Sequence, residues 1–352
     1  MIKKRTLLTT LVLLSVMQGS VQARMPYDDF FHIGRNEYNE SYIKWDKNGE
    51  FILDKLAGES DKVVDDGKSV VIDIYSTIER KNDIGTIFFL SGYSNEKNIT
   101  VNFHEDATFD GGDNDSGVGQ SSFKLGGFNK SDDVVINLDK DKTLSVISST
   151  VSYNNEQNFH LDFGSSAVIN NGHLVVKNLY PNDPSDYAAG IMVKANSKLT
   201  VDNQSVKILR EFNRDENIWP DWTDVGLYLS NSEASFTTGT FIIGSSDSKK
   251  YDSFETGTEI YNSDLTITSD DVYILGSDYA LVAMRDSAVT IEDDTNGSIT
   301  LINKSSDISK NSESSAVYVE GNKSSVPEVN LTSDQINILS NNKSVWASGD
   351  GG

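Results

Sequence analysis

The stretch EIYNSDLTITSDDVYILGSDYALVAMRDSAVTIEDDTNGSITLI, residues 259–302, decides the fold. It consists of short aliphatic and β-branched runs separated by Asn, Asp, Ser and Gly, which is the pattern of strands joined by turns. In Leu265-Thr266-Ile267 and in Val289-Thr290-Ile291, a threonine stands between two aliphatic residues. Successive side chains of a strand point to opposite faces. We therefore expect the aliphatic side chains to face a core and the threonines to face solvent.

A triplet of such strands recurs on both sides of this stretch. The second strand of each successive unit is marked by Leu199, Ser235, Leu265, Val289 and Val329, at intervals of 36, 30, 24 and 40 residues. Constant strands with variable loops favour an all-β fold, a right-handed parallel β-helix with three strands in each coil, because only the loops can change length without disturbing the stack. A β-propeller would require four strands per blade at an even period. A β-sandwich stays open as the alternative, because one sequence does not show which strands pair.

The composition excludes several classes of protein. The 352 residues contain no cysteine and carry 53 acidic against 30 basic side chains, a formal charge of −23. Without cysteine there is no disulfide scaffold, thiolate metal site or cysteine nucleophile. We expect no nucleic-acid partner, because phosphate binding requires clustered Lys and Arg. The hydrophobic share of 37% is enough for a folded core.

The first 23 residues have the three parts of a secretory signal peptide. Lys3, Lys4 and Arg5 form a positive segment, Leu7–Met17 is apolar, and Val21-Gln22-Ala23 offers small residues for cleavage after Ala23. An apolar segment of eleven residues is too short to cross a bilayer core of ~30 Å. We expect an exported protein with no transmembrane segment in its mature chain.

Three regions follow from these patterns. Residues 1–23 are the expected signal peptide, residues 24–83 the expected N-terminal cap region, and residues 84–352 the expected β-helical domain. Helix is expected to be nearly absent after residue 84, because no long apolar repeat of 3.6 residues competes with the strand pattern.

The signal peptide, the acidic Asn-, Ser-, Thr- and Gly-rich chain and the strand triplets at 191–209 and 281–302 resemble the passenger region of an autotransporter (type V secretion), over roughly residues 84–342. The resemblance implies a β-helical stalk that passes through the periplasm of a Gram-negative bacterium and becomes a cell-surface or extracellular adhesin for glycans or proteins of host or neighbouring cells. The family pattern continues into a C-terminal translocator barrel, whereas this sequence ends at Gly352. A truncated passenger, another export route and a likeness of fold alone all stay open, and a link to the outer membrane requires a barrel outside this sequence.

Residues for catalysis are scarce. His32, His104, His160 and His173 are the only histidines, and none belongs to a catalytic motif. We expect no enzymatic activity. The alternative is a carbohydrate-active β-helical enzyme, a polysaccharide lyase or hydrolase, which would need carboxylates together on one face of consecutive coils. The sequence alone does not assemble such a set.

An acidic glycine turn provides a candidate calcium site. Asp113 and Asp115, within Gly111–Gly117, offer alternating carboxylate ligands. The motif occurs once, and its twelfth position is Lys124 rather than a bidentate Glu. A flexible acidic turn is the competing interpretation, and no other cofactor is expected.

A tryptophan-containing loop is the candidate contact surface for a partner. Trp219 and Trp222, with Asp221 and Asp224, lie between two strand units. Aromatic rings beside carboxylates on a loop suit a carbohydrate or a basic protein. The competing interpretation is that both rings fold back over the edge of a coil.

The signal sequence makes one prediction. The exported protein should begin at Arg24, because cleavage follows Val21-Gln22-Ala23. Mass spectrometry of the N-terminal peptide of exported material measures this directly. Exported material that retains Lys3 would contradict it.

Overall fold

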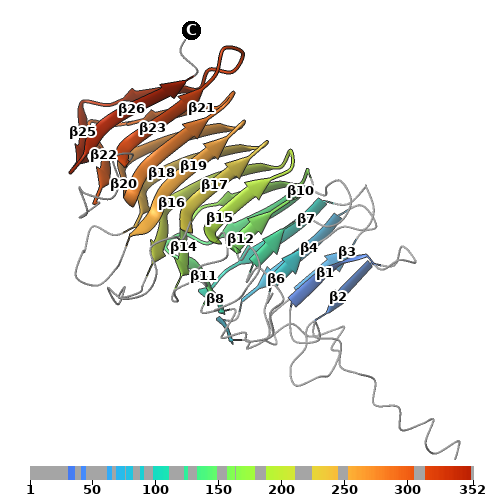
Figure 1. Ribbon diagram of the computed structural model, residues 1–352. Helices are drawn as coiled ribbons and strands as arrows, with labels where there is room; N and C mark the ends of the chain where they lie inside the picture. The colour runs from blue at the N-terminus through green and yellow to red at the C-terminus, as the bar shows by residue number, and fades with distance from the viewer. Residues whose placement is uncertain are drawn as a thin grey trace, which may run out of the picture.

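The computed structural model describes residues 31–35, 41–44, 62–65, 69–75, 77–81, 88–90, 98–110, 123–125, 133–148, 157–162, 164–178, 188–210, 224–244, 253–304 and 314–349. Every regular element in these ranges is a β-strand, as expected. The strands follow one another as stacked coils from the N-terminal to the C-terminal end (Figure 1).

Each coil passes through three faces. The first face comprises β4 (Ser69–Ile74), β7 (Asn98–Phe103), β10 (Asp133–Leu138), β13 (Ser166–Asn170), the first parts of β16 (Lys198–Arg210), β18 (Glu233–Ile243) and β20 (Asp264–Met284), then β21 (Ala288–Glu292) and β24 (Glu328–Thr332). The second face comprises β5 (Ile78–Lys81), β8 (Ala107–Asp110), β11 (Thr143–Ser148), β14 (His173–Asn178), later parts of β16, β18 and β20, β22 (Ser298–Asn303) and β25 (Gln335–Ser340).

The third face closes the coil. It comprises β6 (Phe88–Leu90), β9 (Phe123–Leu125), β12 (Gln157–Leu161), β15 (Ala188–Lys194), β17 (Asp224–Ser230), β19 (Phe254–Tyr261), the last part of β20, β23 (Ser315–Gly321) and β26 (Lys343–Gly349). Among the described strands, β20 alone makes a complete circuit, because its three parts pair in turn with β21, β22 and β23.

The strands of each face pair in parallel and in register, which confirms the β-helix and rules out the β-sandwich. Leu199 is followed in the same column by Ala234, Leu265, Val289 and Val329. The expected register was therefore wrong by one residue at Ser235. Ala234 points inward and is 4% exposed, whereas the hydroxyl of Ser235 lies outside, 3.4 Å from that of Thr200.

The interior is a continuous column of apolar side chains. Leu199, Leu265 and Val289 are fully buried, whereas Val329, in the last described coil, is only partly buried. Aromatic rings fill the first coils: Phe103, Phe109, Phe123 and Phe159 follow one another with centroid separations of 6.2, 5.7 and 5.1 Å. A second aromatic contact lies in a later coil, where the buried rings of Phe236 and Phe241 are 5.0 Å apart.

Antiparallel strands lie at the N-terminal end. β1 (Phe31–Arg35) and β2 (Ser41–Lys44) form an antiparallel pair, and β3 (Lys62–Asp65) pairs antiparallel with β4. Parallel stacking also includes this end of the chain, because β1 pairs in parallel with β6, and β4 and β5 pair in parallel with β7 and β8. The first coil therefore starts before residue 84, the expected beginning of the β-helical domain.

The alternation within β20 makes a prediction about stability. Leu265→Asp would place an unpaired charge in the apolar column, where Leu265 is 1% exposed. We expect this change to cost several kcal/mol of a total stability of ~5 to 15 kcal/mol. Thr266→Asp, at an exposed position, should change the free energy of unfolding by ~0.5 kcal/mol or less. Urea denaturation and protease resistance compare the two, and equal behaviour would refute the inward column.

Candidate functional site

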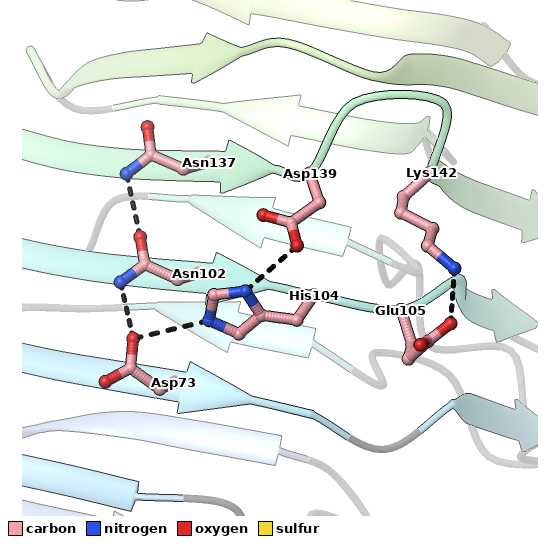
Figure 2. Close-up of polar contacts among 7 residues, drawn as sticks. All are labelled: Asp73, Asn102, His104, Glu105, Asn137, Asp139 and Lys142. Atoms are coloured by element: carbon pink, nitrogen blue, oxygen red, sulfur yellow. Dashed lines mark hydrogen bonds and ion pairs between the residues drawn. The ribbon is translucent and has the colours of Figure 1, made fainter.

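Polar residues from three consecutive coils gather at the corner between the first and second faces. We call this group the His104 cluster. It consists of Asp73, Asn102, His104, Glu105, Asn137, Asp139 and Lys142 (Figure 2). The stacking of β4, β7 and β10 brings them together, since Asp73 pairs with Asn102, and Asn102 with Asn137.

The imidazole of His104 lies between two carboxylates. Its Nδ1 is 3.1 Å from Asp139 Oδ2, and its Nε2 is 3.7 Å from Asp73 Oδ1. The ring stacks on Tyr75 with a centroid separation of 4.1 Å and an interplanar angle of 8°. Both nitrogens thus face carboxylates of neighbouring coils, and the Nδ1 contact links two coils, whereas Nε2 is buried and forms no hydrogen bond.

A ladder of asparagines leads to Asp73 along the outside of the first face. Asn170 Nδ2 donates to Asn137 Oδ1 at 2.9 Å, Asn137 Nδ2 to Asn102 Oδ1 at 2.8 Å, and Asn102 Nδ2 to Asp73 Oδ1 at 2.7 Å. All these amides point the same way, so the ladder ends on a charged acceptor, which strengthens its last hydrogen bond. Asp73 thus accepts a hydrogen bond from Asn102 and faces the His104 ring at 3.7 Å.

An ion pair joins the turns that follow β7 and β10. Lys142 Nζ lies 2.5 Å from Glu105 Oε2. This hydrogen bond raises the pKa of the Lys142 ammonium above its ordinary value, so the group stays protonated at neutral pH. The backbone N–H of Thr143 donates to Asp106 Oδ1 at 2.8 Å across the same two coils. Lys142 therefore supplies a fixed positive charge rather than a base.

In the His104 cluster, carboxylates and a histidine from consecutive coils lie together. The sequence alone did not identify this set. A signal was present, however, in an aliphatic–Asp/Asn–apolar–polar pattern at the ends of three strands. It occurs as Ile72-Asp73-Ile74-Tyr75, Val101-Asn102-Phe103-His104 and Ile136-Asn137-Leu138-Asp139. Aligning these segments would have predicted both the ladder and the histidine position.

A second polar surface lies at the corner between the third face and the first face of the next coil. We call it the corner depression, a hollow of about 600 Å³. It is lined by Asn196, Ser197, Lys198, Asn231, Ser232, Glu233, Asn262, Ser263, Asp264 and Asp286. The lining comes from the same turn in consecutive coils.

Buried serines form the floor of the corner depression. Ser197, Ser232 and Ser263 are 1%, 6% and 4% exposed. The backbone N–H of Ser197 donates to Ser232 Oγ at 3.2 Å, and that of Ser232 donates to Ser263 Oγ at 3.0 Å. The hydroxyls of Ser232 and Ser263 thus accept hydrogen bonds from backbone donors of the buried turns.

The rim of the depression combines amides and charges. Asn196, Asn231 and Asn262 adopt positive φ values of 61°, 49° and 48°, which Asn tolerates better than most residues. Asn262 Nδ2 donates to Asn231 Oδ1 at 2.7 Å. Lys198 and Glu233 form an exposed ion pair at 3.1 Å. This surface offers hydrogen-bond donors and acceptors at a regular spacing.

Of the candidate contact residues, Asp224 lies within the described part of the chain. It is 3% exposed and forms a buried ion pair with Arg210. Its Oδ1 also accepts a hydrogen bond from the backbone N–H of Glu255 at 2.6 Å, and Arg210 Nη1 donates to the carbonyl of Ser253 at 3.2 Å. The pair joins the last residue of β16 to the first residue of β17. The Asp224 carboxylate thus holds Arg210 and Asp224 together, the two residues between which Trp219 and Trp222 lie in the sequence.

The other candidate residues lie outside the described residues. They are Trp219, Asp221 and Trp222 of the expected contact loop, Asp113 and Asp115 of the expected calcium turn, and Ala23 of the expected cleavage site. Within the described ranges, no group of three His, Asp or Glu side chains has an arrangement that could hold a metal ion.

No protein-family model, no curated protein and no solved structure matches this chain. The described part of the chain also contains no helix long and apolar enough to span a bilayer. Functional inference therefore rests on the geometry of the two polar surfaces.

The ion pair at β16 and β17 makes a prediction. Arg210→Met would leave the Asp224 carboxylate buried without a counter-charge, and we expect a loss of about 3 to 5 kcal/mol in the free energy of unfolding. The matched control is Lys198→Met, which breaks an ion pair whose side chains are 60% and 57% exposed. That change should cost about 1 kcal/mol or less. Urea denaturation of both variants tests the contrast, and equal losses would show that the buried pair has no special role.

Proposed function

We propose that the protein is an exported β-helical adhesin or structural stalk of the autotransporter-passenger type, which contacts glycans or proteins of host or neighbouring cells from a bacterial surface. One observation carries this proposal. A rigid parallel stack presents a polar depression of about 600 Å³ built from the same turn in consecutive coils. Binding side chains on a rigid scaffold lose little conformational freedom when a ligand arrives.

The signal-peptide pattern supports export, and the acidic, cysteine-free composition suits a secreted protein of this type. The buried ladders of serine and the outer ladder of asparagine support the stalk role, because they link coils through side chains as well as through backbone hydrogen bonds. A stalk of this kind keeps its binding surface at a fixed distance from its attachment.

A carbohydrate-active enzyme is the second candidate, and the His104 cluster is the observation that favours it. Asp73, His104 and Asp139 come from three consecutive coils, and the Asp139 side chain is 56% exposed. Carboxylates in such positions can act as general acid and base on a polysaccharide. Against this role, both nitrogens of His104 already face carboxylates, so no nitrogen is directed toward a substrate.

Cell binding separates the two functions. We expect the purified exported protein to bind intact cells saturably, and to release neither reducing sugars nor products absorbing at 235 nm from mixed polysaccharides. Flow cytometry measures the first property, and a time course of product release measures the second. Sustained turnover that disappears in Asp139→Asn would establish the enzyme, and the absence of saturable binding to any cell would end the adhesin proposal.

A further inference from the structure

The corner depression has a chemical character that narrows its ligand. All ten lining residues are Asn, Ser, Lys, Glu or Asp, so no apolar side chain contributes to the lining. Protein partners bind most strongly through apolar and aromatic anchors that enter pockets. A surface of amides, hydroxyls and carboxylates instead matches a ligand that is itself rich in hydroxyl groups.

The repeat of the lining also indicates a repeating ligand. Asn196, Asn231 and Asn262 occupy the same turn position in consecutive coils, because Asn196 N donates to the carbonyl of Asn231 at 2.7 Å and the flanking strands remain in register. Strands of neighbouring coils lie ~4.8 Å apart. An extended polymer parallel to the helix axis therefore meets an equivalent asparagine in each of these three coils.

The charge of the rim is unbalanced. Lys198 pairs with Glu233, whereas no cation among the described residues forms an ion pair with Asp264 or Asp286. Both of these aspartates are exposed. Their carboxylates favour a ligand with positive groups and disfavour an anionic polymer, since like charges repel at this distance.

We infer that the corner depression binds a linear polysaccharide containing amino sugars, which lies along the helix axis. Its hydroxyls hydrogen-bond to the asparagine amides, and its ammonium groups pair with Asp264 and Asp286. This inference rests on the proposed adhesin function and specifies its ligand.

The test uses calorimetric titration of the purified exported protein with β-1,4-linked glucosamine oligomers. The comparison ligands are the N-acetylated oligomer, which is neutral, oligogalacturonate, which is anionic, and oligolysine, which has positive charge without hydroxyls. The glucosamine oligomer should bind most tightly, about tenfold or more above each of the others.

Matched variants locate the site. Asn231→Gly combined with Asn262→Gly removes two amides and keeps the turns, because glycine adopts positive φ without strain. This double variant should weaken binding about tenfold or more. Asn171→Gly, at φ 61° on a turn outside the depression, is the control and should leave the affinity unchanged. Asp264→Asn with Asp286→Asn should remove the preference for the glucosamine oligomer over its N-acetylated form.

Several outcomes would overturn the inference. Equal affinity for oligolysine would show that charge alone drives binding, and equal loss in Asn171→Gly would place the site elsewhere. If the protein binds cells but none of the oligosaccharides, the inference fails while the proposed adhesin function stands. If it binds neither, both fail.

Discussion

In-register parallel pairing between coils is the constraint on which the rest of the structure depends. Each strand position lies beside its equivalent in the next coil, so each side chain lies above another of the same orientation. The column from Leu199 through Ala234 to Leu265 and Val289 is the direct result inside the helix. Side chains on the outer surface and at the corners are aligned between coils in the same way.

Polar residues in this fold therefore form ladders rather than isolated contacts. Inside the corner between the third and first faces, the serine column provides acceptors for backbone N–H groups of adjoining coils. On the outer surface, asparagines from β13, β10 and β7 pass hydrogen bonds to Asp73. These ladders satisfy groups whose burial without partners would destabilise the stack. They also generate the regular spacing on which our ligand inference depends.

The two polar surfaces differ in what they leave for a partner. In the His104 cluster, the imidazole and the Lys142 ammonium already contact carboxylates, so most of its bonding capacity is used between coils. In the corner depression, the floor is satisfied internally, whereas the side chains of the rim are exposed, with one hydrogen bond between the amides of Asn262 and Asn231. The His104 cluster therefore serves mainly to link coils, and the corner depression is the better binding site.

The sequence by itself determined the strands, their alternation and the three-strand repeat, because these depend on neighbouring residues. Thr266 between Leu265 and Ile267 predicted which side chains face the core, and the structure confirms it.

Only the tertiary structure decided the register at Ala234, since a shift of one residue leaves the local pattern acceptable but reverses the faces. It also decided the His104 cluster. Asn102 lies 29 residues after Asp73, and Asp139 lies 35 residues after His104. Loops of varying length hide the equivalence of these positions until the coils are stacked. Gly226 is a similar case: a Cβ there would lie 2.4 Å from Ile243 Cγ2, a clash that exists only once β17 packs against the next face.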